Sequence, residues 1–266
     1  RGVREMTFSD YVNRFNAYVD TFRAADGSLV DAMQCKLDHT FEVVRFAELI
    51  EESGPFDADD RFLASLCALF HDVARFEQVK RFTTYNDSLS KFDHGYEGVR
   101  VLFAQDFLRE LSPKQRIVIA AAVEFHNKIA IPEGVLDPYA LKFAHLTRDA
   151  DKLAILDLVL RYFSGELEIH DESLVCLSQN DGTEVSREIV DAVLAGRSAS
   201  YRMIRNENDF KTCLFGWVND IHFTESCRIL KERNFYGKLR AFLPADPLFD
   251  EILTATAQRL SCRCSK

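Results

Sequence analysis

The stretch Phe62-Leu63-Ala64-Ser65-Leu66-Cys67-Ala68-Leu69-Phe70-His71-Asp72 decides how this sequence is interpreted. Its apolar part predicts a buried helix, and the helix ends in the pair His71-Asp72. The pair therefore brings an imidazole nitrogen and a carboxylate within reach of one cation. Such a donor set suits a borderline or hard divalent metal. A His-Asp dipeptide also occurs by chance in many proteins, so the interpretation depends on its partners.

Further candidate ligands lie on both sides of this pair. His39 is upstream, His94 and His126 are downstream, and Asp151 lies in Arg148-Asp149-Ala150-Asp151-Lys152-Leu153. The intervals Asp72 to His94, His94 to His126 and His126 to Asp151 are 22, 32 and 25 residues. Each interval is about one helix plus a loop, so each ligand could come from a different helix of one bundle.

Helical periodicity dominates the sequence and predicts an all-α fold. The first helix is marked by apolar residues at helical spacing, Phe8, Tyr11, Val12, Phe15, Val19 and Phe22. Ser112-Pro113 with Gln115, and Asp137-Pro138, are helix-start signals. A turn-rich stretch at 165–183, which includes a possible short strand at 173–177, predicts a boundary. We therefore expect a metal-binding core over 1–164 and a C-terminal helical extension over 165–266, with helical stretches around 185–194, 210–233 and 247–260.

Each candidate ligand has an ordinary structural alternative. Asp151 has only small or apolar helical neighbours apart from Thr147, and a buried carboxylate is costly unless it is paired or bound to metal. It could instead pair with Lys152 or Arg148. His39 could be a hydrogen-bonded core histidine, His126 a cation at a helix C-terminus, and His94 a loop residue. His145 could support the ligands from behind, whereas His170 and His222 are expected to be structural.

Taken together, the order His…His-Asp…His…His…Asp resembles the HD-domain superfamily of metal-dependent phosphohydrolases. The resemblance covers roughly residues 35–160 and rests on three strings, 69–78, 93–95 and 148–153. It implies an HD-domain helical bundle and a two-metal site of Mn, Mg, Fe or other divalent ions. The implied metal ligands are His39, His71, Asp72, His94, His126 and Asp151.

Charge counting favours two ions over one. His39, His71, Asp72 and Asp151 carry two negative charges, which cancel one divalent ion. His94 and His126 could hold a second ion without adding charge, with Asp72 as the bridge. The resulting positive site would attract a phosphate, and hydroxide on the metal would be available at neutral pH for in-line attack at phosphorus.

The implied function is cleavage of a small phosphate ester, such as a nucleotide or a phosphorylated metabolite. Asp72 and Lys152 are the candidate catalytic residues. For most of the basic side chains near the ligands a solvated surface charge is at least as good an interpretation, and Lys152 could merely pair with Asp149. The candidate substrate-binding residues are Arg75, Lys91, Asn127, Lys128, Arg148 and Lys152.

Two other functions fit the same ligand order. The six-ligand set also resembles the di-iron oxygenases of the superfamily, and a non-catalytic module that binds metal or nucleotide as a sensor is the third possibility. Because no ligand residue is missing, the sensor ranks lowest. Sequence motifs for other chemistries, such as a phosphate-binding glycine loop or a Gly-x-Ser-x-Gly elbow, do not occur.

Composition limits the partners. The net charge of −9 and the pI of about 5.3 argue against a nucleic-acid polymer and leave a small anionic substrate possible. Seven cysteines, odd in number and scattered, predict reduced thiols and a cytoplasmic protein. The apolar run at 117–123 is too short to cross a membrane, and no signal peptide is visible.

Overall fold

The computed structural model describes residues 6–168 and 182–264. Helices account for all its regular structure, and no strand occurs within those residues, which confirms the predicted all-α class. The possible strand at 173–177 and His170 lie outside the described residues. The chain divides into two compact units, residues 1–151 and 152–266. This division falls inside one helix, α8 (Pro138–Phe163), and the boundary at 164/165 stays a prediction.

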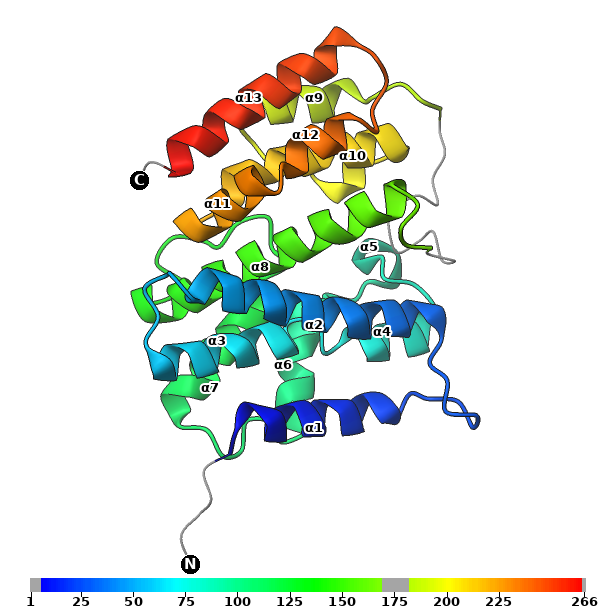
Figure 1. Cartoon of the computed structure of the whole chain (residues 1–266). Coiled ribbons are helices and arrows are strands. Elements are labelled where there is room, and N and C mark those ends of the chain that lie inside the picture. The colour runs from blue at the N-terminus through cyan, green and yellow to red at the C-terminus, as the bar shows by residue number, and fades with distance from the viewer. Residues whose placement is uncertain (1–5, 169–181, 265–266) are drawn as a thin grey trace, which may run out of the picture. The chain divides into compact units, whose positions relative to one another are not determined.

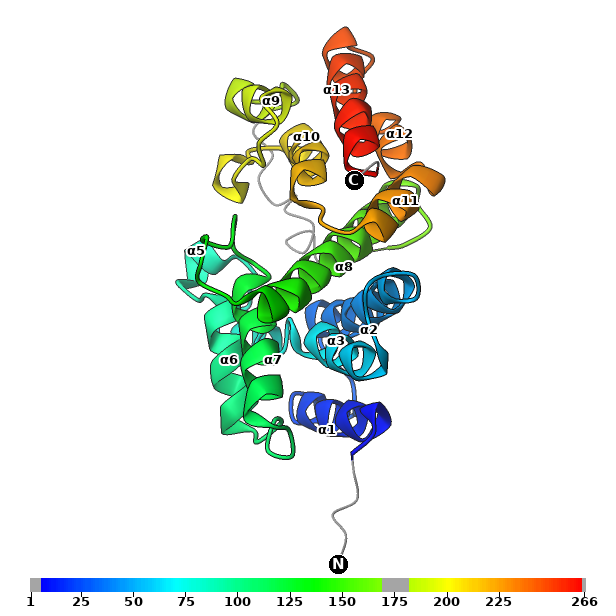
Figure 2. The same cartoon turned by 90° about the vertical axis from the view of Figure 1, so that its left-hand side faces the viewer.

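The first unit is built around α3 (Ala58–Phe70), the helix that carries the deciding stretch. Figures 1 and 2 show α3 between α1 (Phe8–Asp20) and α2 (Asp31–Glu51). It also packs on α7 (Pro113–Phe125). Residues 63–70 are all buried, which is why the stretch lacks a polar face. The remaining helices of this unit are α4 (Arg75–Phe82), α5 (Asp87–Ser90), α6 (His94–Ala104) and the first half of α8.

Local signals and aromatic packing fix these helices. Ser112 and Gln115 form the predicted capping box, and the Asp137 carboxylate accepts hydrogen bonds from the first backbone N–H groups of α8. At the end of α3, the Phe70 ring packs edge-on against Tyr11 and Phe15 of α1. Each such aromatic pair adds about 0.5–1.5 kcal/mol beyond its buried area. The C-terminal end of α3 is thus held rigidly.

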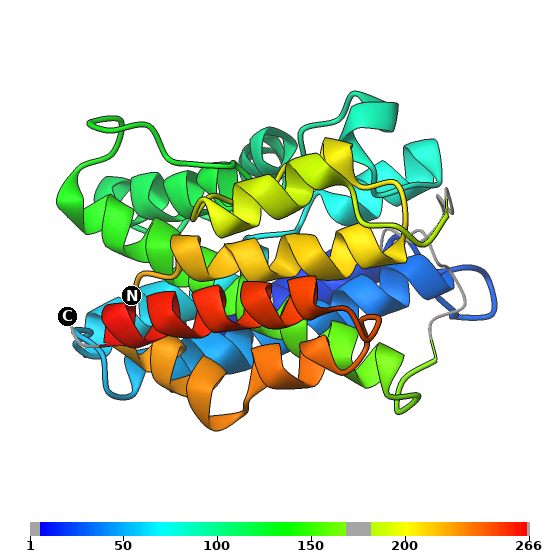
Figure 3. The ribbon, with the colours of Figure 1, turned by 90° about the horizontal axis from the view of Figure 1, so that it is seen from above.

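The second unit consists of further, C-terminal helices. In Figure 3, α10 and α13 run side by side. The middle predicted stretch is not one helix, because the 3₁₀ turn η3 (Gly216–Asp220) separates α10 from α11. Each helix in the described part of this unit is too short or too polar to span a bilayer. Its elements are the second half of α8, α9 (Arg187–Leu194), η2 (Tyr201–Met203), α10 (Glu207–Phe215), η3, α11 (Thr224–Glu232), α12 (Phe235–Arg240) and α13 (Pro247–Cys264).

Glu51, the last residue of α2, carries a buried carboxyl group. It lines a hollow of about 370 Å³ in the first unit, together with Glu48, Arg61 and their neighbours. Its side chain is buried, and Oε2 has no hydrogen-bond partner among the described residues. Burial and the nearby Glu48 raise the pKa of Glu51 to about 8, although Arg61 acts in the opposite direction. The group is therefore mostly protonated at neutral pH in the folded protein.

This raised pKa makes the stability of the protein depend on pH. Between the ordinary pKa of 4.5 and the folded value of about 8, the folded state binds more protons than the unfolded state, so the free energy of unfolding falls as pH rises. Glu51→Gln removes the ionisation and should raise Tm by roughly 3 °C or more at pH 8.5 but change it little at pH 4.5. Thermal unfolding at both pH values checks this. The exposed neighbour Glu52→Gln is the control, and an equal shift at both pH values would contradict the expectation.

Candidate metal centre

Five helices bring the six predicted ligands together. His39 lies in the middle of α2, His71 and Asp72 follow α3, and His94 begins α6. His126 follows α7, and Asp151 lies in α8. Within the described residues, two groups have ligand atoms close enough to hold an ion: His39, His71 and Asp151, and Asp72, His94 and His126. The ligand atoms of each group lie within 4.8 Å of one another.

The first group contains a completely buried imidazole nitrogen, Nε2 of His71. His39 Nε2 lies 3.0 Å from Asp151 Oδ1, and His71 Nε2 lies 3.8 Å from the same oxygen. The His71 side chain is completely buried, and its Nε2 has no hydrogen-bond partner among the described residues. A buried polar atom of this kind costs free energy unless something binds it. A cation bound between the side chains of His39, His71 and Asp151 would provide His71 Nε2 with a partner.

Backbone contacts orient His71 and His126 in the same way. His71 Nδ1 lies 2.7 Å from the carbonyl oxygen of Ala68, and His126 Nδ1 lies 2.7 Å from that of Val123. Because a carbonyl only accepts, each Nδ1 carries the proton and donates it. In the neutral ring, Nε2 then presents a lone pair toward the centre. This support of a ligand from behind is typical of metal-binding histidines.

The second group places two imidazole nitrogens against each other. His94 Nε2 and His126 Nε2 are 3.1 Å apart. His94 Nδ1 donates to Asp87 Oδ2 at 2.5 Å, so its Nε2, like that of His126, carries a lone pair in the neutral ring. Two lone pairs at this distance repel unless a proton or a metal ion lies between them. The residues of this group thus also fit a metal ion.

Asp72 belongs to the second group and also faces His71 of the first group. Its Oδ1 is 3.5 Å from His94 Nε2 and 3.4 Å from His126 Nε2, whereas its Oδ2 is 3.5 Å from His71 Nε2. Lys36 Nζ also contacts Oδ2, at 2.8 Å. Although burial acts in the opposite direction, Lys36, followed by the other neighbouring cations, holds the pKa of Asp72 well below its usual range. The carboxylate is therefore ionised and available to two ions at once.

The histidines of the centre differ in their pKa. Burial, aided by Arg75, lowers the pKa of His94 to about 4. Burial, aided by Lys36, also lowers the pKa of His39. Both rings are neutral at neutral pH, which is the form that binds metal. For His71, burial acts to lower the pKa, but the Asp72 and Asp151 carboxylates outweigh it and raise the pKa. The same negative charge attracts a metal cation.

Two residues of the centre were not expected from the sequence. Lys36 lies three residues before His39 on the same face of α2, and this spacing is the only signal that could have indicated it. Asp87 in α5 orients His94, and it is itself held by Arg75 Nη1 at 2.9 Å. Burial opposes the change, but the His94 hydrogen bond and Arg75 together lower the pKa of Asp87 below its usual range. No spacing rule connects Asp87 to the ligands.

The structure places some of the predicted substrate-binding residues beside the centre. Arg75 Nε lies 3.4 Å from Asp72 Oδ1, while its Nη1 binds Gln78, Asp87 and the Tyr85 carbonyl. Asn127 Nδ2 lies 3.2 Å from His94 Nδ1 and donates to Asp93 Oδ1 at 3.0 Å. Lys128 also pairs with Asp93. These side chains border the second group of ligands.

The other predicted substrate-binding residues have different surroundings. Lys91 is exposed and ends α5 with a left-handed backbone, φ 52°. Arg148 is buried and donates to four backbone carbonyls, those of Phe125, His126, Lys128 and Ile129. Lys152 is also buried, and Lys152 Nζ lies 2.6 Å from Asp220 Oδ2. Asp149 is completely buried, which excludes the pair at the surface that the sequence allowed.

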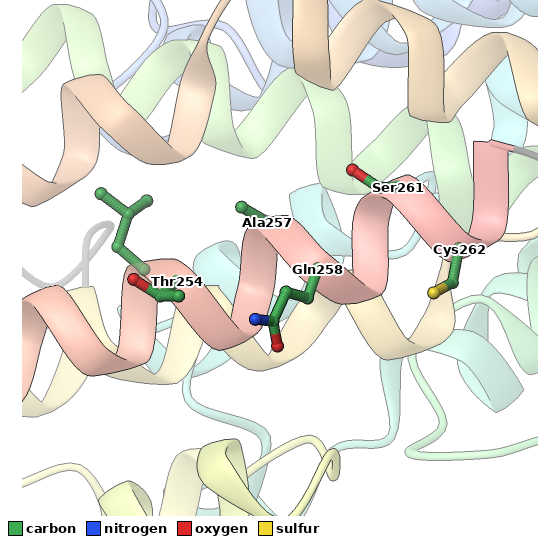
Figure 4. Close-up of a pocket in the computed structure, with 6 residues that line it drawn as sticks. Thr254, Ala257, Gln258, Ser261 and Cys262 are labelled. Carbon is green, nitrogen blue, oxygen red and sulfur yellow. The ribbon is translucent and has the colours of Figure 1, made fainter.

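A second hollow, in the other unit, offers no comparable chemistry. It measures about 540 Å³ and lies on one face of α13 (Figure 4). Hydroxyl, amide and thiol groups are its polar side chains, and no carboxylate or imidazole lines it. The candidate centre is therefore the His/Asp cluster of the first unit. The lining residues of the hollow are Leu253, Thr254, Ala257, Gln258, Ser261 and Cys262.

Comparison with known protein families agrees with this geometry. Residues 37–156 match the family model described as the HD domain, and all six candidate ligands lie within this range. The chain therefore contains an HD domain, whose buried His/Asp clusters are consistent with an HD metal site. No curated protein and no solved structure matches the chain.

Proposed function

We propose that this protein is a metal-dependent phosphohydrolase that cleaves a small phosphate ester, such as a nucleotide or a phosphorylated metabolite. The observation that carries the proposal is the position of Asp72, whose two oxygens face two separate ligand groups. A carboxylate in this position can bridge two ions. The HD domain over 37–156 supports the same conclusion, because this superfamily comprises metal-dependent phosphohydrolases.

The six candidate ligands would form two metal positions. His39, His71 and Asp151 would hold one ion, His94 and His126 the other, and Asp72 both. When bound, divalent ions would polarise the phosphoryl group and lower the pKa of a coordinated water. The protein fixes the donor atoms before substrate arrives, because the imidazole rings are locked by hydrogen bonds from behind. Asp72 is the proposed catalytic residue because both positions depend on it.

Side chains beside the second ligand group are the proposed contacts for substrate. Asn127 and Lys128 follow His126 directly, and Arg75 adjoins Asp72. Lys91 is exposed and could reach a phosphate as a flexible point charge. Lys152 is proposed to meet a phosphoryl oxygen or the leaving group, since it follows Asp151. Arg148 donates to four carbonyls between residues 125 and 129. We therefore propose that it contributes to substrate binding indirectly, by holding this segment in place.

Phosphate release without oxygen tests this function. The protein, stripped of metal and reloaded with Mn²⁺, should release phosphate from at least one member of a panel of phosphomonoesters and phosphodiesters under anaerobic conditions. His71→Ala should release none, whereas Asp59→Asn, an exposed residue at the start of the same helix, should behave as the wild type. Consumption of a phosphate-free substrate only with reduced iron and oxygen would establish the oxygenase alternative. No turnover under either condition would favour the sensor module.

A further inference from the structure

Lys152 belongs to a small network of charged side chains in the second unit. Its Nζ lies 2.6 Å from Oδ2 of Asp220, the last residue of η3. The other oxygen, Oδ1, lies 2.9 Å from His222 Nε2. Both oxygens of the Asp220 carboxylate are thus engaged, one by the ammonium and one by the imidazole. Lys152 itself is only 9 % exposed, so its flexible stem is confined as well.

The backbone around Asp220 is clamped from α13. Arg263 donates from Nη1 to the carbonyl of Ile221 at 2.6 Å, and from Nη2 to the carbonyl of Asn219. The Asn219 side chain donates in turn to the Gly216 carbonyl at 2.9 Å. The two carbonyls on either side of Asp220 are therefore held by a single planar guanidinium. This support fixes the carboxylate far more firmly than an exposed surface pair requires.

The position of Lys152 in the sequence connects this network with the chemistry of Asp151. The two residues are consecutive in α8, so their side chains leave the helix about 100° apart. A lysine ammonium normally explores many rotamers, and a group that must meet a reacting oxygen loses this freedom in each turnover. A carboxylate that already holds the ammonium in place removes this entropy cost from each turnover, because the side chain is ordered before the substrate binds.

We propose that Asp220 is a positioning residue, which holds the Lys152 ammonium in the orientation in which it meets a phosphoryl oxygen of the substrate. His222 and Arg263 fix Asp220 in turn. This inference rests on the proposed phosphohydrolase function. In this role Asp220 would affect the reaction through Lys152, whereas an ordinary ion pair would contribute only to stability.

The pair itself can be tested without measuring activity. Lysine acylation by an amine-reactive reagent, followed by mass spectrometry, reports how accessible and how ordered Lys152 is. In Asp220→Asn the labelling rate of Lys152 should rise several-fold. The matched control is Asp157→Asn. Asp157 lies in α8, as Lys152 does, and pairs with Arg233 at 3.5 Å. Its side chain is 23 % exposed, against 19 % for Asp220. Unchanged labelling of Lys152 in Asp220→Asn would overturn the inference.

Kinetics separate a positioning role from a structural one. With the phosphate ester that the Mn²⁺-loaded wild type hydrolyses, Asp220→Asn should lower kcat/KM about tenfold, mainly through kcat. Asp220→Glu should recover part of the loss, and Asp157→Asn should leave kcat and KM unchanged. In a Lys152→Ala background, Asp220→Asn should cause no further loss, because the residue acts only through that lysine.

Two results distinguish the failure of this inference from that of the function. If the wild type hydrolyses a phosphate ester but Asp220→Asn has wild-type kinetics, or loses the same factor with and without Lys152, Asp220 is not a positioning residue. If the wild type hydrolyses no ester of the panel, the proposed function itself fails, and the inference fails with it. Should Asp220→Asn not fold, His222→Gln provides the same comparison, with a smaller expected loss.

Discussion

Replacement of Asp72 by Ala is expected to remove both metal ions and to lower phosphate release by roughly a thousandfold or more. The reason is geometric. The two Asp72 oxygens face separate groups of ligands, with Oδ1 toward His94 and His126 and Oδ2 toward His71. Without this carboxylate, the first group keeps two imidazoles and a single acid, and the second group keeps two imidazoles and no acid. Neither set can compensate the charge of a divalent ion.

A single-ligand variant provides the comparison for Asp72→Ala. His94→Ala should lose mainly the ion of the second group, because His39, His71, Asp72 and Asp151 still surround the other position. Elemental analysis of both variants, together with circular dichroism to show that they fold, makes the distinction. Equal loss of one ion in both variants would remove Asp72 from the bridging position.

Arg148→Met is expected to destabilise the protein by about 3 kcal/mol. Arg148 is buried, and its guanidinium donates to the carbonyls of Phe125, His126, Lys128 and Ile129. The last carbonyls of a helix have no partner within the helix, and here one arginine of α8 satisfies those at the end of α7. Methionine fills a similar volume but leaves these four carbonyls without the guanidinium donor.

Urea unfolding checks the contribution of Arg148. Arg148→Lys should recover little of the loss, because an ammonium cannot reproduce the planar fork that spans four carbonyls. Arg45→Met breaks a local pair with Glu42 in which the two side chains are 41 % and 40 % exposed, and it should change stability by no more than about 0.5 kcal/mol. If Arg148→Met and Arg45→Met lose the same free energy, Arg148 does not hold the segment after α7.

The parts of this molecule that depend on a local pattern were predictable from the sequence. The buried helix before His71, the caps at Ser112 and Asp137, and the order of ligands along successive helices are all local or periodic features. The HD-domain assignment and the all-α class are confirmed on that basis. Each ligand occupies a helix end or a helix face, where spacing alone constrains its position.

Long-range pairs of charges were not predictable in the same way. Asp87 orients His94, and Asp220 holds Lys152 from 68 residues away. An aspartate that supports a ligand looks, in a sequence, like any solvated aspartate, because no period connects it to its partner. For the same reason Arg148 could be proposed as a substrate contact, while the carbonyl groups that it binds became evident only from the packing of α8 against the end of α7.

The metal-to-protein ratio of the wild type and of Asp72→Ala, each purified without chelator and reloaded with Mn²⁺, tests the central claim most directly. If Asp72 bridges two ions, the wild type should bind two ions per chain, about 3.5–4 Å apart as in other two-metal sites, and Asp72→Ala should bind none. A wild type that binds no ion or a single ion, or an Asp72→Ala variant that retains one or two ions, would contradict this role of Asp72.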